Sequence, residues 1–183
     1  MERAADLFAE HGIAATSVDE VLTAAGAGKG QFYHYFSGRD ELAAAAVGFR
    51  CAQVVAGLTQ ALGAVSSLAG LEQALARFTA GFEQTGMPGC PIGTLSAEVA
   101  GRNEDARLQA AAGFDAWERL LAGALERMRQ RGDLRADADP AVLATGLLAS
   151  IEGGMVLSQA RQDMTSLRAA VEAGLAQVRA FLS

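Results

Sequence analysis

Apolar residues recur at intervals of three and four along the whole chain, and polar or glycine-containing stretches separate the resulting segments. This spacing predicts amphipathic α-helices, because it places the apolar side chains on one helical face. The expected helices lie near residues 2–11, 18–25, 28–34, 38–62, 68–85, 91–100, 104–131, 140–161 and 164–182. Runs of β-branched residues are nearly absent, and the chain has only 3 prolines. The pattern therefore predicts an all-α protein with about nine helices.

Residues at the ends of several segments are of the types that start or stop helices. Ser17 and Glu20 form a capping box, in which each side chain satisfies a backbone amide at the helix start. Gly26 can adopt a positive φ and end this short helix with a sharp turn. The other expected ends are Gly12 in a left-handed conformation, Ser37 as an N-cap with Asp40 at N3, and Asp139 as the cap before Pro140.

The first 45 residues contain only short helices separated by glycine turns. A segment of this length buries little apolar surface, so the long helix that begins near residue 38 must join it to the rest of the protein. We expect a small three-helix domain over residues 1–45 and a larger helical domain over residues 46–183.

Residues 17–36 have the spacing of a helix-turn-helix, whose second helix enters the major groove of DNA. Lys29 lies at the start of that second helix, where its charge adds to the positive end of the helix dipole and favours a phosphate. Gly30 lets the backbone approach DNA closely, and Gln31 can form two hydrogen bonds with an adenine edge. The spacing favours DNA binding, although a glycine turn between short helices also occurs in proteins without this function.

Five aromatic or histidine side chains lie in and just after this second helix. Phe32 and Phe36 are four residues apart, share a helical face and are expected to be core residues. Some of the side chains between them must point outward, with polar tips suited to phosphate oxygens. These side chains are Tyr33, His34 and Tyr35. Packing of all five in a core is the alternative interpretation, and Arg39 is a further candidate for a phosphate contact.

The overall charge argues against binding of nucleic acid through a broad basic surface. The formal net charge is −6, and residues 1–50 do not reverse it. Their basic residues are Arg3, Lys29, Arg39 and Arg50, against the acidic Glu2, Asp6, Glu10, Asp19, Glu20, Asp40 and Glu41. Because nonspecific binding to the phosphate backbone requires clustered positive charge, DNA binding by this chain must depend on a local arrangement of residues.

The segment Ala25-Gly-Ala-Gly-Lys-Gly-Gln-Phe-Tyr-His-Tyr-Phe36 resembles the TetR family of transcriptional regulators, whose N-terminal domain ends in Ala-Gly-x-x-Lys-Gly-x-hydrophobic-Tyr-x-x-Phe. The similarity continues through Leu7, Phe8 and Gly12 upstream and through Arg39, Glu41 and Leu42 downstream. The resemblance implies a helix-turn-helix domain followed by a helical domain for ligand binding and dimerisation. It also implies a homodimer that binds a double-stranded DNA operator and is released by a small-molecule inducer. On this resemblance the DNA-contacting positions are Ser17, Lys29, Gly30, Gln31, Tyr33, Tyr35 and Arg39.

The sequence departs from the family pattern in two places. Ala27 and Gly28 occupy positions where relatives often carry hydroxyl groups, so contacts with phosphates or bases are expected to be fewer. Family members usually have a basic arm before the first helix, and only Arg3 represents it in this sequence. Either the sequence starts late, or binding depends more strongly on the recognition helix.

In TetR-like proteins the remaining helices form an inducer pocket. Aromatic pairs at helical spacing, adaptable methionines and polar groups among apolar neighbours are suited to line one. The candidates are Phe78, Phe82, Met87, Cys90, Leu95, Phe114, Trp117, Leu121, Glu152 and Met155. Ordinary core packing is the alternative for each of them. Glu98 and Glu152 each lie among apolar residues, at an edge or facing a cavity, and a cavity at Glu152 would favour a cation or a hydrogen-bond donor.

Cys90 lies at an expected helix start, directly before Pro91, where the helix dipole lowers the pKa of a thiol. The block of residues 89–98 resembles one found in TetR regulators of the LmrA/YxaF type. Other family members with a Gly-Cys at this helix start respond to electrophiles, so the resemblance implies a thiol-sensing repressor as an alternative. A purely structural cysteine is the second interpretation.

The segments 140–161 and 164–182 resemble the dimerising helix pair of the family. Small residues in them permit close helix approach, and larger apolar residues supply buried area, so two copies are expected to form a four-helix bundle. The expected interface residues are Leu147, Ile151, Gly154, Leu175 and Val178.

Other functional classes receive little support. His11 and His34 are the only histidines, and no nucleophile–base set or metal-ligand spacing occurs, so we expect no enzyme, no metal site and no cofactor. No stretch approaches the ~18 uninterrupted apolar residues of a membrane span. Two cysteines and no secretory leader at the start indicate reduced thiols in the cytoplasm. The acidic first domain leaves a ligand-binding protein that has lost operator recognition as an alternative.

Overall fold

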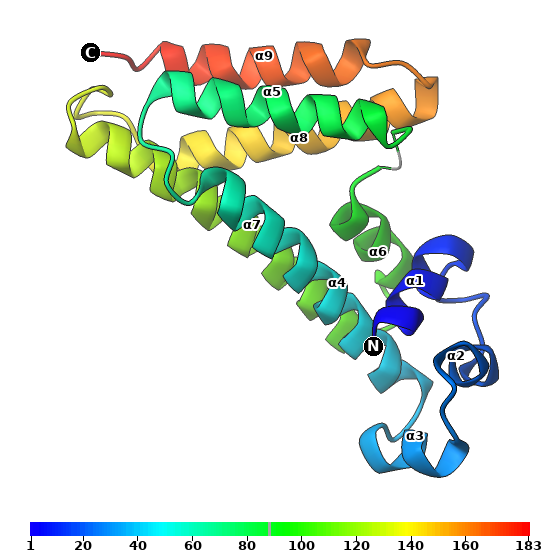
Figure 1. Ribbon diagram of the computed structural model, residues 1–183. Coiled ribbons are helices and arrows are strands. Elements are labelled where there is room, and N and C mark those ends of the chain that lie inside the picture. The colour runs from blue at the N-terminus through cyan, green and yellow to red at the C-terminus, as the bar shows by residue number, and fades with distance from the viewer. Residues whose placement is uncertain (88) are drawn as a thin grey trace. The chain divides into compact units, whose positions relative to one another are not determined.

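The computed structural model describes residues 1–87 and 89–183, which form helices joined by short turns (Figure 1). The helices are α1 (Glu2–His11), α2 (Val18–Ala25), α3 (Lys29–Tyr35), α4 (Arg39–Leu62), α5 (Leu68–Gln84), α6 (Pro91–Val99), α7 (Glu104–Gln130), α8 (Pro140–Arg161) and α9 (Thr165–Arg179). Each expected segment is helical, so the prediction of an all-α fold with about nine helices is confirmed. The β pairing in the described part is an isolated bridge between Leu134 and Leu182.

The chain forms two compact units. The first comprises residues 1–55 and 91–114, and the second comprises residues 56–90 and 115–183. Helices α4 and α7 therefore each contribute residues to both units. In this division α6 belongs to the same compact unit as the N-terminal helices. The division into a DNA-binding domain of residues 1–45 and a ligand-binding domain of residues 46–183 stays a prediction.

The N-terminal helices of the first unit share one apolar core. Its buried members include Phe8, Val21, Leu22, Phe32 and Leu42, which come from α1, α2, α3 and the start of α4. The ring of Phe36 is partly buried against the same cluster, with its centroid 5.5 Å from that of Phe32. These side chains fix the short helices α2 and α3, which are too short to be stable alone.

Helix α4 is held against α1 and α7 within this unit. An ion pair of 2.8 Å joins Arg50 of α4 to Asp6 of α1. A Cβ atom at Gly113 of α7 would lie 2.9 Å from the sulfur of Cys51, so a side chain there would push α7 away from α4. Burial raises the pKa of the Cys51 thiol, which favours its uncharged form.

The second unit is built on α8, α9 and α5, which run side by side (Figure 1). Glycines permit the close packing of α8 on α9, because a Cβ at Gly154 would lie 2.8 Å from the Cβ of Ala170, and one at Gly174 would lie 2.5 Å from Leu147. Ion pairs of 2.8 Å between Arg168 and Glu83 and of 2.7 Å between Arg179 and Glu72 join α9 to α5.

Most expected helix ends are present. The capping box of Ser17 and Glu20, the left-handed Gly26 and the Asp139 cap before Pro140 are all confirmed. Two of the predicted helix ends were wrong in detail. Gly12 has φ 86 and ψ 151, which is positive but outside the left-handed helical region. The backbone amide and hydroxyl of Ser37 donate to Glu41, at 2.7 and 2.8 Å, and not to Asp40, because α4 begins only at Arg39.

Helices α4 and α8 are long and apolar enough, by length and composition alone, to span a membrane. Their mean hydropathy over an 18-residue window reaches 1.5 and 1.6, with 28% and 44% of those windows buried. Alanine and core leucines supply much of this hydropathy, and α8 buries one face against α9. The composition of these helices therefore does not by itself indicate a membrane protein. The face of α8 that points away from α9 is nevertheless apolar.

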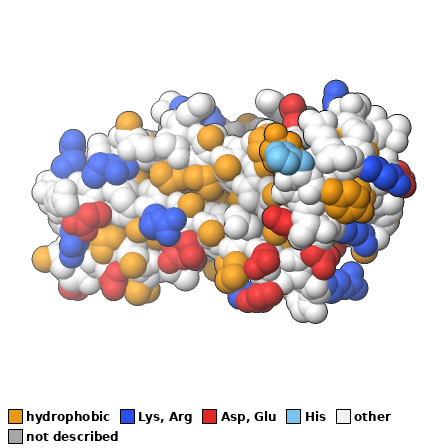
Figure 2. Space-filling model, turned by 90° about the horizontal axis from the view of Figure 1, so that it is seen from below, with side chains coloured by type: hydrophobic (Ala, Val, Ile, Leu, Met, Phe, Trp, Pro, Cys, Tyr) orange, Lys and Arg blue, Asp and Glu red, His pale blue; other side chains and the backbone are white. Residues whose placement is uncertain are grey.

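Charged side chains of both signs are mixed on the face of the molecule shown in Figure 2, and hydrophobic side chains lie between them. This face carries no broad region of a single sign. The distribution agrees with the negative net charge and indicates that any DNA contact depends on a few placed side chains.

Candidate DNA-binding surface and effector site

The recognition pair is formed by α2, a tight turn and α3. Gly26 has φ 63 and ψ 30, so it ends α2 in the left-handed conformation that glycine adopts without strain. The extended Gly28 then begins α3, which contains only the residues 29–35. The turn directs the N-terminus of α3, with its unpaired backbone amides, to the surface of the unit.

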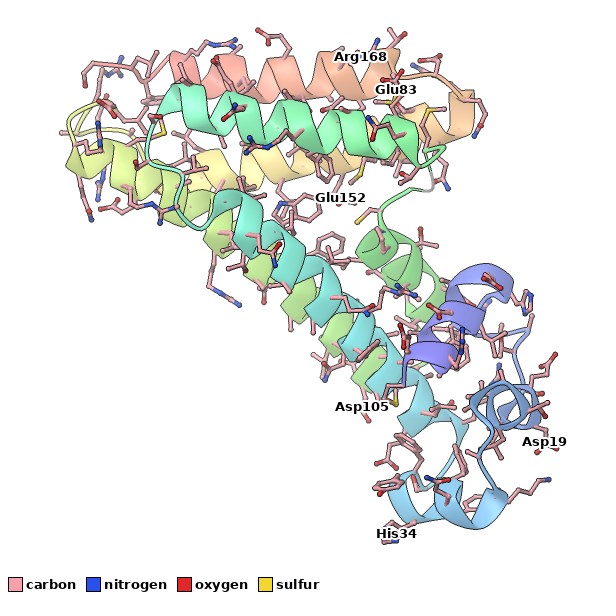
Figure 3. The ribbon with its side chains drawn as sticks, in the orientation of Figure 1. Asp19, His34, Glu83, Asp105, Glu152 and Arg168 are labelled. Carbon is pink, nitrogen blue, oxygen red and sulfur yellow. The ribbon has the colours of Figure 1, made fainter. Side chains whose placement is uncertain are left out.

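The side chains of α3 divide into one buried anchor and an exposed polar face. Phe32 enters the core, whereas Tyr33 and Tyr35 are 67% and 65% exposed. Gln31 and His34 are exposed as well, and Figure 3 shows His34 on the outer side of α3, pointing away from α1. The predicted DNA-binding residues are thus accessible in the single chain, and their contact with DNA stays a prediction.

Lys29 has an acidic neighbour on α2. Its Nζ lies 3.0 Å from Asp19 Oδ1, and both side chains are largely exposed. A solvent-exposed ion pair of this kind is weak, so it holds Lys29 beside the N-terminus of α3 without preventing a phosphate from replacing Asp19. The pair was not expected from the sequence, since the two residues lie on different helices.

The hydroxyl of Ser17 is already engaged within α2. It accepts from the Glu20 amide at 3.2 Å and donates to Glu20 Oε2 at 2.7 Å, and the Ser17 amide donates to the same oxygen at 2.7 Å. The bond from the Ser17 backbone, followed by that from its side chain, lowers the pKa of Glu20. Ser17 therefore first caps α2, and its predicted DNA contact would have to share this hydroxyl.

Arg39 has intramolecular partners that the sequence did not indicate. Its guanidinium donates to the backbone carbonyl groups of Ile13 and Ala14, in the loop between α1 and α2. The amide of Ala14 donates to Glu98 Oε1 of α6 at 2.9 Å. Arg39 was predicted to contact a phosphate, and Glu98 to lie at an edge or face a cavity. Both side chains also hold one loop of the DNA-binding region, Glu98 lines a small hollow there, and the phosphate contact of Arg39 stays a prediction.

Several candidate effector residues lie in the second unit, and two of them are in contact. The rings of Phe78 and Trp117 lie 5.7 Å apart at an interplanar angle of 59°, so these residues of α5 and α7 form an aromatic pair. Phe82, Leu121 and Met155 are buried. The half-buried Met87 has a positive φ of 57°, and Leu95 and Phe114 belong to the first unit.

Cys90 and Glu152 form a polar pair in the otherwise apolar surroundings of α8. Burial raises the pKa of Glu152, and a hydrogen bond with the Cys90 side chain opposes that shift. Within the described residues, Glu152 Oε1 is buried without a hydrogen-bond partner. Figure 3 shows Glu152 on the side of α8 away from α9. A buried carboxylate oxygen without a donor is suited to accept a hydrogen bond from a ligand.

A hollow of about 490 Å³ also lies in the second unit, along α5 and α9. Its floor includes Ala76, Ala80 and Val171, and ion-paired residues border it, so it is lined by other residues than the predicted effector site. Among the described residues, no group of three or more His, Cys, Asp or Glu side chains is placed to hold a metal ion.

The residues predicted for the dimer interface lie inside the single chain. All five are buried there, where α8 and α9 pack within one protomer. These residues are Leu147, Ile151, Gly154, Leu175 and Val178. A side chain already covered by its own chain has little surface left to bury against a second copy, and the role of these five residues in an interface stays a prediction.

Comparison with known proteins agrees with both regions. Residues 1–46 match the family model of bacterial regulatory proteins of the tetR family, and residues 67–174 match that of the tetracyclin repressor-like C-terminal domain. An HTH-type transcriptional regulator of Mycobacterium tuberculosis is 34% identical over 90% of this chain and 84% of its own length. The regulator YxaF of Bacillus subtilis is 31% identical over 91% of this chain and 86% of its own length.

Solved structures support the same assignment of the fold. The crystal structure of the regulatory protein TetR from Rhodobacter sphaeroides is 26% identical, with a TM-score of 0.79 over 99% of this chain and 96% of that chain. Members of the family are DNA-binding regulators and not enzymes. The chain belongs to the TetR family of bacterial transcriptional regulators.

Proposed function

We propose that this regulator is a repressor that binds a palindromic operator as a homodimer and is released by a small molecule. The observation that carries the proposal is the exposed polar face of α3, which is anchored by the buried Phe32 and lies beside Lys29. Two such helices about 34–36 Å apart would enter successive major grooves. Ligand binding that favours a different separation would lower operator affinity, with a coupling of about 1–3 kcal/mol.

The DNA-binding proposal is tested with an operator selected from random duplexes by the purified protein. Gln31→Ala should relax base preference within each half-site, because glutamine reads an adenine edge. Lys29→Ala should weaken binding to all sequences and reduce the salt slope by about 0.9 for each phosphate that is no longer neutralised. Arg135→Ala, a change in the second unit, is the control. Unchanged affinity and slope in the α3 variants would favour a ligand-binding protein without operator recognition.

We place the effector site in the second unit, at the aromatic pair of Phe78 and Trp117 and at Glu152. The aromatic surface and the buried carboxylate oxygen favour a ligand that combines an apolar part with a cationic or hydrogen-bond-donating group. Trp117 is the only tryptophan, so its fluorescence reports binding directly. An inducer should quench or shift that emission and release the operator over the same concentration range.

A thiol-sensing repressor is a second candidate, favoured by the position of Cys90 directly before Pro91, the first residue of α6. Cys90 is buried, so an electrophile would have to enter the unit before reacting. Replacement of Cys90 by serine separates the two functions. A pocket-type repressor would remain inducible by its ligand, whereas a thiol sensor would lose its response to electrophiles.

We propose that the dimer forms through the outer faces of α8 and α9. Val142, Ala149 and Val156 are exposed and recur every seven residues on α8, with Gly153 and Ala160 beside them. Ala169, Ala173 and Ala176 form a similar exposed row on α9. Repeats of seven with small residues suit close packing of four helices from two copies. We infer a cytoplasmic location, where such a dimer would meet DNA.

A further inference from the structure

Side chains of two other helices hold the loop between α1 and α2, and both of them bind the backbone of Ala14. The amide of Ala14 donates to Glu98 Oε1, at the last turn of α6, over 2.9 Å. The carbonyl of Ala14 accepts from Arg39 Nη2, at the first turn of α4, over 2.8 Å. Arg39 also donates to the Ile13 carbonyl. Both backbone groups of Ala14 are therefore fixed by side chains far from it in sequence.

The loop has the shape that these hydrogen bonds require. A Cβ at Gly12 would lie 3.0 Å from Glu98 Oε1. Gly12 also has a φ of 86°, which residues other than glycine rarely adopt. The buried Thr16 donates its hydroxyl proton to the Gly12 carbonyl at 2.8 Å. The loop is thus closed on itself on one side and bound to the Glu98 carboxylate on the other.

The corner between α6 and α7 makes a further contact with the start of α4. Asn103 donates through Nδ2 to the Asp40 carbonyl at 2.9 Å, and its Oδ1 accepts from the Ala106 amide at the start of α7. Asn103 and Asp40 border a hollow of about 130 Å³ that also adjoins Arg39 and Glu98. The corner is therefore joined to the DNA-binding region at two points within the first unit.

We infer that Glu98 and Arg39 are positioning residues for operator binding, which hold the α1–α2 loop, and with it α2 and α3, against the corner of α6 and α7. They act through the backbone of Ala14 and not by touching DNA. A protein whose competent arrangement is only partly populated binds with an affinity reduced by that fraction. Removal of either hydrogen-bonding side chain should therefore weaken operator binding while the phosphate interactions stay the same. The inference rests on the DNA-binding function of the first unit.

Two replacements of Glu98 separate positioning from charge. Glu98→Gln removes the negative charge but keeps an oxygen within reach of the Ala14 amide, whereas Glu98→Asp keeps the charge and shortens the reach. We expect Glu98→Asp to lower operator affinity about fivefold, the effect of one hydrogen bond, and Glu98→Gln to stay within about twofold of the parent protein. If Glu98 acted by repelling phosphates, Glu98→Gln would strengthen binding and Glu98→Asp would leave it unchanged.

Arg39→Ala provides the second test, with the salt series as its readout. Positioning predicts an affinity about fivefold lower with an unchanged salt slope, whereas a direct role of Arg39 in neutralising a phosphate predicts a slope reduced by about 0.9. Fluorescence anisotropy with the full-length protein and a selected operator duplex gives both values. Glu83→Asp, which alters an ion pair with Arg168 in the second unit, is the matched control.

Hydrogen exchange at the Ala14 amide provides a readout of the hydrogen bond itself. It should be faster in Glu98→Asp and unchanged in Glu98→Gln. If the parent protein binds the operator and the Glu98→Asp and Arg39→Ala variants bind it with the same affinity, this inference is overturned, whereas the proposed function stands. Failure of the parent protein to bind any duplex would overturn the inference and the proposed function together.

Discussion

Lys29 is the only lysine of the chain, and its position beside Asp19 sets how strongly it can act on DNA. The carboxylate holds the ammonium group close to the N-terminus of α3 but also competes with any phosphate for it. Both side chains are solvent-exposed, so the competition is weak and depends on ionic strength. The pair is therefore expected to tune operator affinity and not to abolish it.

Asp19→Asn should strengthen operator binding about fivefold at low salt, because it frees Lys29 and removes a negative charge near the DNA in both protomers. The gain should shrink as salt rises. Anisotropy titrations at two ionic strengths measure it. Asp137→Asn removes the same charge from an exposed pair with Arg135 in the second unit and should change affinity little. Equal effects of the two variants would show that net charge alone is responsible.

Glu152 should make stability depend on pH in the opposite sense to a carboxyl group whose pKa is lowered in the folded state, such as Glu20. Burial raises its pKa above the ordinary value of 4.5, so the folded state binds the proton more tightly than the unfolded chain. Its favourable contribution is complete below the ordinary pKa and is lost as pH rises through the raised pKa. Glu152→Gln should therefore increase the melting temperature of the ligand-free protein near pH 8, by about 2 °C or more, and change it less near pH 4.

Thermal unfolding at these two pH values tests the expectation, with the exposed Glu10→Gln as the control. A lower melting temperature of Glu152→Gln at pH 8 would indicate that the ionised carboxylate is stabilised in the folded state. The same variant should also weaken Trp117 quenching by a cationic inducer if Glu152 contacts that ligand.

At the scale of the helix, α2 depends on its capping box because it has only 8 residues. Ser17→Ala should lower the melting temperature by about 2–4 °C at pH 7, whereas Ser17→Thr should retain most of the cap. The Ser17 backbone and hydroxyl bonds lower the pKa of Glu20, so this contribution is present above the ordinary pKa of 4.5. It is lost as pH falls through the lowered value. The difference between the two variants should therefore narrow in acid, as melting curves from pH 7 to pH 3 would measure.

The helices and their caps could be predicted because their causes are local. Ser17 and Glu20 are three residues apart, and Gly26 needs only its own backbone freedom, so the sequence contains the complete signal. The exposed face of α3 followed from the spacing of Phe32 and Phe36. The partners of Arg39 and Glu98 could not be predicted, since 84 residues separate Ala14 from Glu98. No local pattern records such a contact.

The proposed interface on α8 shows a second limit of sequence reasoning. Periodicity identified Leu147 and Ile151 as apolar positions to be buried, and they are buried. It could not tell whether their own chain or a second copy covers them, because α8 is apolar around most of its circumference. Only the packing of α9 on Gly154 shows which face is used within the protomer.

For the whole molecule, the net charge and the proposed dimerisation are expected to act together on DNA binding. Each chain carries a formal charge of −6, so long-range forces oppose its approach to DNA. Weak nonspecific binding is the expected consequence, and the proposed dimer would recognise its operator through a few contacts made twice. Affinity would then depend on two recognition helices binding at once, which raises the effective concentration of the second after the first has bound.

Val156→Arg should therefore disrupt both assembly and operator binding. Val142, Val156 and Leu157 of α8 are 66%, 58% and 46% exposed in the single chain, more than is usual for large apolar side chains in a row. A charge on this face would be buried without a partner in the dimer, at a cost that favours separate chains. Sedimentation should show a shift from dimer to monomer, and operator affinity should fall about 100-fold or more, because each monomer binds one half-site. Leu108→Arg, at a 50% exposed leucine of α7, should leave both properties unchanged. A Val156→Arg protein that still sediments as a dimer would exclude this face, and the apolar surface of α8 would then require a different partner.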